Sequence, residues 1–79
     1  MVLEGTYKVK SVLRKTTAKM FSNVVEGDNI KFQVELKRVG GYGRTHATYI
    51  RCQNLRNMEV VYKSFNELAN ILHCFEFEE

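Results

Sequence analysis

The sequence predicts a mainly β fold with one C-terminal helix. Short segments in which apolar and polar residues alternate recur along the chain, and clusters of turn-forming residues separate them. A single amphipathic segment of helical period follows near the end. With 79 residues, the chain has room for one hydrophobic core, so we expect a single globular domain over residues 1–79.

The N-terminal half contains two predicted strands. Residues 6–14 alternate with Val12 as the exception, and residues 30–37 alternate without a fault. Side chains on a strand point alternately to its two faces, so the apolar residues of each strand share one face: Tyr7, Val9 and Leu13 on the first, and Ile30, Phe32, Val34 and Leu36 on the second. Between the strands, residues 15–25 are compatible with a helical turn or a short strand, and residues 26–29 form a turn cluster.

The glycine-rich segment 38–44 is expected to be a flexible connection, because glycine tolerates positive φ and resists regular structure. Residues 45–52 are rich in threonine, tyrosine and isoleucine and predict a third strand, although both of its faces mix polar and apolar side chains. A turn around residues 53–57 leads into a fourth strand over 58–63.

The C-terminal segment predicts a capped helix and a closing strand. Ser64 and Glu67 have the spacing of a capping box, in which the serine caps the first turn and the glutamate reaches back. One helical stripe collects the apolar residues Phe65, Leu68, Ala69, Ile71 and Leu72. Residues 74–78 alternate again. Four or five short strands with one helix suit a small SH3-like or OB-like barrel, and the alternative is a strongly curved, open antiparallel sheet.

Charge is distributed unevenly along the chain. The net charge is +3, yet residues 1–63 hold all 12 basic residues with five acidic ones, whereas residues 64–79 hold four acidic residues and no basic one. A strongly basic sheet indicates a surface that binds phosphates. The acidic tail has two possible roles: it masks this basic surface in cis, or it contacts a basic protein partner.

Single-stranded nucleic acid is therefore the first predicted ligand. Basic residues grip phosphates, and a tyrosine in a glycine loop beside a sheet stacks on an unpaired base. The predicted contact residues are Lys8, Lys10, Arg14, Lys37, Arg38, Tyr42 and Arg44. The competing interpretation is that the lysines only solvate the outer face of the sheet and protect its edges.

A protein-interaction module is the alternative function. An inhibitor or adaptor of the kind that phage and mobile elements encode would use the glycine loop, a sheet edge or the acidic C-terminal tail. A homo-oligomer is a further expectation, because association would enlarge the small core.

Several kinds of chemistry are not expected. The glycine loop lacks the Gly-Lys-Ser/Thr ending of a nucleotide-binding P-loop. The four side chains that favour zinc are His46, Cys52, His73 and Cys74, and their spacing does not match paired zinc knuckles. We therefore predict no metal, no cofactor and no enzymatic activity, with both cysteines reduced.

Compartment follows from the composition of the N-terminal residues. They carry several charges and no apolar run of signal-peptide length, and nowhere does the chain have an apolar stretch long enough to span a membrane. The expected location is the cytoplasm, with no membrane partner. A proline-free chain that begins at Met1 is expected to be a complete gene product.

Overall fold

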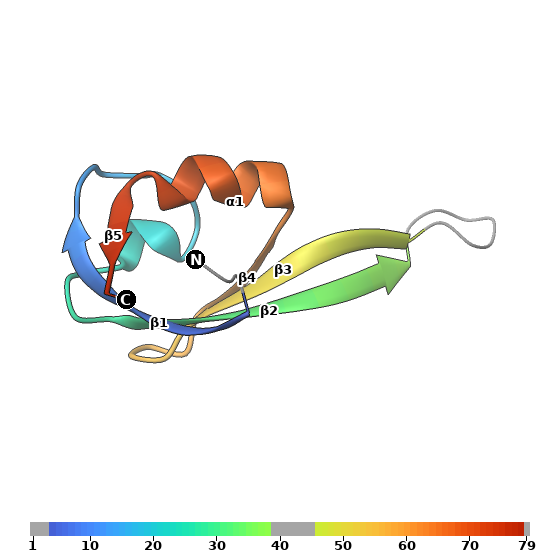
Figure 1. The fold of residues 1–79 in the computed structure, drawn as a ribbon, viewed down its shortest axis with the longest axis horizontal. Helices are drawn as coiled ribbons and strands as arrows, with labels where there is room; N and C mark the ends of the chain where they lie inside the picture. The colour runs from blue at the N-terminus through green and yellow to red at the C-terminus, as the bar shows by residue number, and fades with distance from the viewer. Residues whose placement is uncertain (1–3, 39–45, 79) are drawn as a thin grey trace.

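The computed structural model describes residues 4–38 and 46–78, without the side chains at positions 37, 38, 46 and 47. In chain order the elements are β1 (Gly5–Val12), the 3₁₀ helix η1 (Phe21–Asn23), β2 (Asn29–Arg38), β3 (His46–Asn54), β4 (Val60–Lys63), α1 (Phe65–Leu72) and β5 (Phe75–Phe77). The strands form one antiparallel sheet in the order β4-β3-β2-β1-β5 (Figure 1). The predicted mainly β fold with one C-terminal helix is confirmed, in its open, strongly curved form rather than as a closed barrel.

Strand β1 curves because its two halves pair with different strands. Residues 5–8 pair with β2, whereas residues 9–12 pair with β5 after a register shift between Val9 and Ser11. Such an irregularity bends a strand and increases its twist. The strand ends at Val12, since the N–H groups of Leu13 and Arg14 both donate to the carbonyl of Cys74. The predicted strand over residues 6–14 therefore ends two residues early, and Leu13, expected on the same face as Tyr7 and Val9, lies outside the strand and is 58% exposed.

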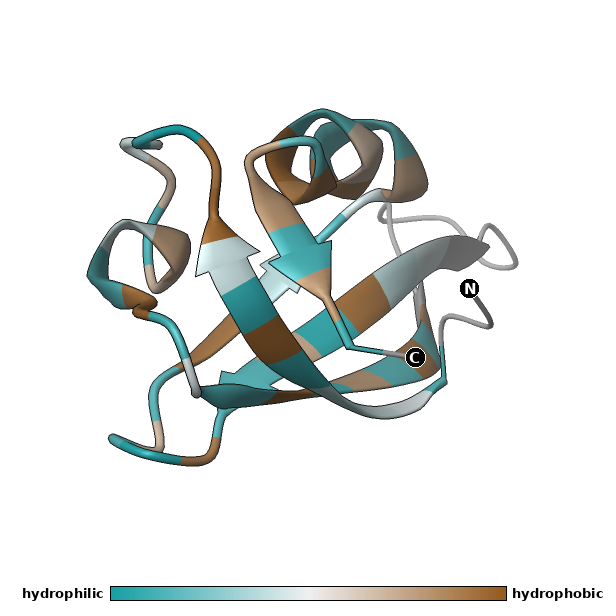
Figure 2. Ribbon diagram, turned by 60° about the vertical axis from the view of Figure 1, so that its left-hand side comes forward, coloured by the Kyte–Doolittle hydropathy of each residue, from teal (hydrophilic) through white to brown (hydrophobic). Residues whose placement is uncertain are grey.

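The core lies on the concave face of the sheet, beneath α1 and η1. Alternation along the strands, visible as changes of colour in Figure 2, turns the apolar side chains inward. The buried residues of the core are Val9, Met20, Phe21, Val24, Ile30, Phe32, Ile50, Cys52, Leu68, Ile71 and Phe75. The open question about residues 15–25 is thus resolved as one short 3₁₀ turn that contributes Phe21 to the core.

The β2–β3 hairpin extends beyond the rest of the molecule, as Figure 1 shows. Its pairing runs without interruption from Ile30 opposite Asn54 to Arg38 opposite His46. Leu36 has the inward phase that the sequence predicts, but its side chain is 71% exposed because this part of the hairpin lies past the core. The predicted alternation of this strand is confirmed, and Leu36 shows that the face shared by its apolar residues is buried only where the core lies beneath it.

Helix α1 follows the predicted cap. The Ser64 hydroxyl accepts a hydrogen bond from the N–H of Glu67 at 3.3 Å, which confirms the serine half of the capping box. Leu68 and Ile71 face the core, but Phe65 is 49% exposed and Ala69 is exposed. Of the five residues in the predicted apolar stripe, Leu68 and Ile71 are buried and Leu72 packs against the core while partly buried. In the part of the chain that the structure describes, no helix has the length and apolar character needed to cross a membrane.

Candidate functional site

The convex face of the sheet carries the polar and aromatic side chains that alternate with the core. Inward-facing Ile50 and Cys52 fix the phase of β3 and settle which of its faces is buried. The outer face, as we call this surface below, consists of Thr6, Lys8 and Lys10 on β1, Lys31, Gln33 and Glu35 on β2, Tyr49, Arg51 and Gln53 on β3, and Val60 and Tyr62 on β4.

Strand register brings two tyrosines and an arginine together on the outer face. Arg51 lies opposite Tyr62 on β4 and opposite Gln33 on β2. Tyr49 precedes Arg51 by two positions, so it lies diagonally across from Tyr62, at a typical separation of about 7–8 Å between such neighbours. Tyr62 is 39% exposed and Tyr49 is half-buried. Register thus places two tyrosines on positions next to Arg51.

Hydrogen bonding and charge complete this surface. Arg51 Nη1 donates to Gln53 Oε1 at 3.0 Å, which directs the guanidinium along β3. Lys8 and Lys31 are exposed, and within residues 4–38 and 46–78 neither forms an ion pair. Glu35, opposite Tyr49, is the carboxylate on this part of the face. The arrangement therefore places cationic and aromatic side chains on neighbouring positions of one face.

The predicted contact residues do not all lie on one surface. Lys8 and Lys10 share the outer face, and Lys10 Nζ pairs with Glu76 Oε1 at 3.2 Å. Arg14 lies past the end of β1, where it lines a groove that includes neither lysine. The side chains of Lys37 and Arg38 lie outside the described residues, as do Tyr42 and Arg44 entirely.

Sequence reasoning did not assign Tyr49, Arg51 and Tyr62 to the site. Both faces of the third strand mix polar and apolar side chains, so its phase was undetermined. A signal was nevertheless present, because positions 49, 51 and 53 alternate with the more apolar positions 50 and 52. Register with β4 could not be predicted, since the turn before Val60 is longer than a two-residue hairpin loop.

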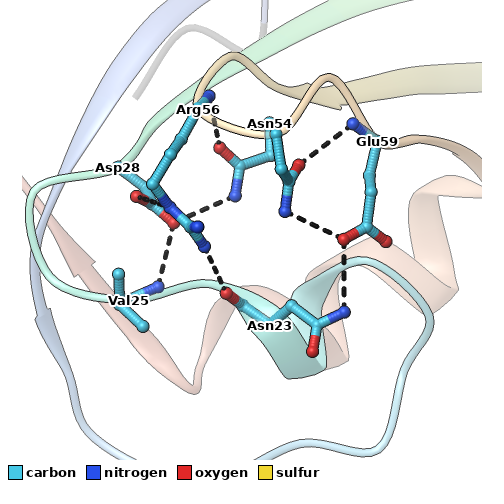
Figure 3. Close-up of polar contacts among 7 residues, drawn as sticks. Asn23, Val25, Asp28, Asn54, Arg56 and Glu59 are labelled. Carbon is cyan, nitrogen blue, oxygen red and sulfur yellow. Dashed lines mark hydrogen bonds and ion pairs between the residues drawn. The ribbon is translucent and has the colours of Figure 1, made fainter.

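A buried polar cluster lies at the opposite end of the sheet from the long hairpin (Figure 3). Asp28, 4% exposed, accepts hydrogen bonds from the N–H of Val25 at 3.0 Å, from Asn54 Nδ2 at 2.9 Å and from Arg56 Nε at 2.7 Å. Burial alone would raise the pKa of Asp28, but the hydrogen bonds from Arg56, Val25 and Asn54 outweigh it and lower the pKa below 3.8. This ionised carboxylate is fully partnered, so its role is structural.

The same cluster connects three segments that are distant in sequence. Arg56 Nη2 donates to the carbonyl of Asn23 in η1 at 2.9 Å, and Asn23 Nδ2 donates to Glu59 Oε1 at 3.2 Å. Asn54 Oδ1 accepts from the N–H of Arg56 at 2.9 Å. The loop after β1 is thereby fixed to the β3–β4 turn.

Among the described side chains, the two cysteines and His73 do not form a ligand set. Cys52 and Cys74 are free thiols, and burial raises the pKa of Cys52 to about 12 against the opposing effect of Lys63. His73 is exposed, and the side chain of His46 lies outside the described residues. Among the described side chains, no group of three or more potential ligands is positioned to hold a metal ion.

Comparison of the chain with protein-family models, with curated proteins and with solved structures finds no match.

Proposed function

We propose that the protein is a non-enzymatic module that binds single-stranded nucleic acid on its outer face. The observation that carries this proposal is the placement of Tyr49, Arg51 and Tyr62 on neighbouring positions of two paired strands. Exposed aromatic rings on a sheet provide stacking platforms for unpaired bases, and arginine adds both charge and a planar stacking surface.

Phosphate contacts come from the cations around these rings. Lys31 lies opposite Gln53, one row from Arg51, and Lys8 is exposed on the adjacent β1. Lys10 contributes less than its charge implies, because Glu76 neutralises it in cis. A single strand that runs across β1 to β4 would meet Lys8, Lys31 and Arg51 in turn. The predicted contributions of Lys37, Arg38, Tyr42 and Arg44 would extend this path along the hairpin and remain predictions.

The test compares two exposed aromatic residues on different surfaces. Tyr62→Ala removes a ring from the outer face, whereas Phe65→Ala removes one from α1, which lies on the other side of the sheet. Stacking contributes about 1–3 kcal/mol per base, so the Kd for a fluorescein-labelled oligothymidylate should rise roughly 5- to 150-fold for Tyr62→Ala and stay unchanged for Phe65→Ala. Equal affinities of the two variants, both folded by circular dichroism, would refute the proposal.

Lys31→Ala provides a second, electrostatic test. Loss of one phosphate contact to a single strand should weaken binding to all sequences alike and reduce the slope of log K against log salt by about 0.7. A slope equal to that of the parent protein would show that Lys31 does not contact the nucleic acid.

A protein-interaction module, which includes association of identical copies, remains the alternative. Glu76 and Glu78 are exposed but belong to the sheet edge, because Phe75–Phe77 form β5 and the N–H of Glu78 donates to the carbonyl of Lys8. The observation that favours a protein partner lies elsewhere, in the groove at the end of β1.

A further inference from the structure

An open groove of about 590 Å³ lies between the end of β1, the start of β5 and η1. Its floor is apolar and continuous with the core, since Phe21, Val24 and Phe75 are at most 6% exposed. Val12 and Val25 form the more accessible walls, with 40% and 51% of their surface exposed. The volume lies within the range of sites that accept small molecules or side chains.

The rim of the groove carries an excess of positive charge. Arg14 and Lys15 line it, both exposed, and Glu26 is the carboxylate among the lining residues. Within the described part of the chain, neither cation forms an ion pair. Unpaired cations beside an apolar floor complement a ligand that combines carboxylates with an apolar group.

The backbone beside the rim is available for pairing. Arg14 still donates its N–H to Cys74, but among the residues that the structure describes no backbone–backbone hydrogen bond involves Lys15, Thr16 or Thr17. Extended peptides bind by adding their backbone to segments with unpaired N–H and C=O groups. This favours a polypeptide over a lipid or a small carboxylate.

A strained turn positions Phe21, which belongs to the floor of the groove. Met20 has φ 66° and ψ −52°, and the N–H of Phe21 donates to the carbonyl of Lys19 at 2.7 Å across it. This is a γ-turn of the rare, strained kind, which persists only where its surroundings determine it. Burial of Met20 and Phe21 supplies that constraint, so this part of the floor is preorganised before a ligand arrives.

We propose that this groove binds an extended acidic segment of a partner protein. An apolar side chain of the segment would pack against the exposed surfaces of Val12 and Val25, above the buried floor, while flanking carboxylates would meet Arg14 and Lys15. Unpaired bases are a poorer fit, because the two phenylalanines of the floor are buried and present no ring face for stacking. The site is separate from the outer face, and the two proposals stand or fall independently.

A random dodecapeptide library displayed on phage provides the probe. Selection is made against the intact protein, and enriched peptides are synthesised and titrated into ¹⁵N-labelled protein. The groove variant is Arg14→Glu with Lys15→Glu, and the matched control is Lys8→Glu with Lys31→Glu, which changes charge equally on the outer face. All four side chains are exposed, so both variants should fold, which their amide spectra verify directly.

Enriched peptides should be acidic with at least one apolar residue, and their amide shifts should map to residues 11–26 and Phe75. The groove variant should weaken binding by about tenfold or more, and the control should not. Absence of enrichment, enrichment of neutral or basic peptides, or shifts confined to the outer face would each overturn the proposal. Nucleic-acid binding should show the opposite pattern, because it should respond to the control variant and not to the groove variant.

Discussion

Replacement of Asp28 by alanine should destabilise the fold more than any other exchange of a single carboxylate. The carboxylate accepts the N–H of Val25, Asn54 Nδ2 and Arg56 Nε, and Asn54 is completely buried. A buried donor that loses its partner costs about 1–3 kcal/mol. Asn54 Nδ2 meets this condition in full, whereas the N–H of Val25 falls at the lower end of the range, about 1 kcal/mol, because Val25 is 51% exposed. The predicted loss in the free energy of unfolding is therefore roughly 2–4 kcal/mol, without any contribution from the exposed Arg56.

The measurement is urea unfolding followed by far-ultraviolet circular dichroism, with Glu26→Ala as the matched control. Glu26 belongs to the same turn, is exposed and forms no hydrogen bond or ion pair within the described residues, so its loss should change stability by less than about 0.5 kcal/mol. Asp28→Asn should fall between the two, because an amide can keep its acceptor toward one donor but turns an N–H toward another. An Asp28→Ala variant as stable as Glu26→Ala would refute the structural role assigned to the cluster.

Acid should act through the same carboxylate. Because the pKa of Asp28 is lowered in the folded state, the native protein binds fewer protons there than the unfolded chain. Its contribution to stability is complete above the unfolded pKa of 3.8 and is lost as the pH falls through the lower, folded pKa. Stability should therefore decline below about pH 4, and more steeply in the parent protein than in Asp28→Asn. Parallel pH profiles of the two proteins would contradict this assignment.

Three further predictions concern single side chains. Glu76→Gln should free Lys10 from its ion pair and tighten binding to single-stranded oligonucleotides at low salt, as measured by fluorescence anisotropy. Unchanged affinity would show that Glu76 does not reduce the contribution of Lys10 to binding. Iodoacetamide at pH 8 should alkylate Cys74 and spare the buried Cys52, whose pKa of about 12 leaves almost no thiolate, and peptide mass spectrometry would reveal the reverse. Phe77→Ala should lower the unfolding free energy by roughly 2–3 kcal/mol in urea titrations, and a neutral effect would contradict the packing of Phe77 against the rings of Tyr7, Phe32 and Phe75.

The last of these predictions bears on how the acidic segment should be tested. Phe77 packs edge-on against Tyr7 and Phe32, with ring centroids 6.3 and 6.2 Å away. Deletion of the C-terminal residues would therefore remove part of the core together with the charges. Glu76→Gln changes the charge and leaves β5 intact.

Local pattern was sufficient to predict most strands and the helix, because alternation and capping depend on neighbours in sequence. It was insufficient where long-range contacts decide. The end of β1 is set by the carbonyl of Cys74, more than 60 residues away, and the exposure of Leu36 is set by how far the core extends beneath the hairpin. Neither property is encoded near the residue that it affects.

The candidate site was predictable only in part for the same reason. Strand phase identifies Lys8 and Lys10 as outward, since β1 alternates well, but the Tyr49, Arg51 and Tyr62 cluster exists only once β3 and β4 are in register. Asp28 illustrates a second limit. Its position in a turn cluster was evident, yet its burial depends on Asn54 and Arg56, which lie more than 25 residues away.

The most direct test of the proposed function is fluorescence anisotropy of the parent protein with labelled single-stranded and double-stranded oligonucleotides. With three phosphate contacts, from Lys8, Lys31 and Arg51, the slope of log K against log salt for a single strand should be roughly −2, so affinity should fall about 20-fold between about 50 and 200 mM salt. The account predicts micromolar or tighter binding to single strands at the lower salt and weaker binding to the duplex. Absent binding, or equal and salt-insensitive binding to both forms, would contradict the proposed function. These cations would then serve only to solvate the outer face of the sheet.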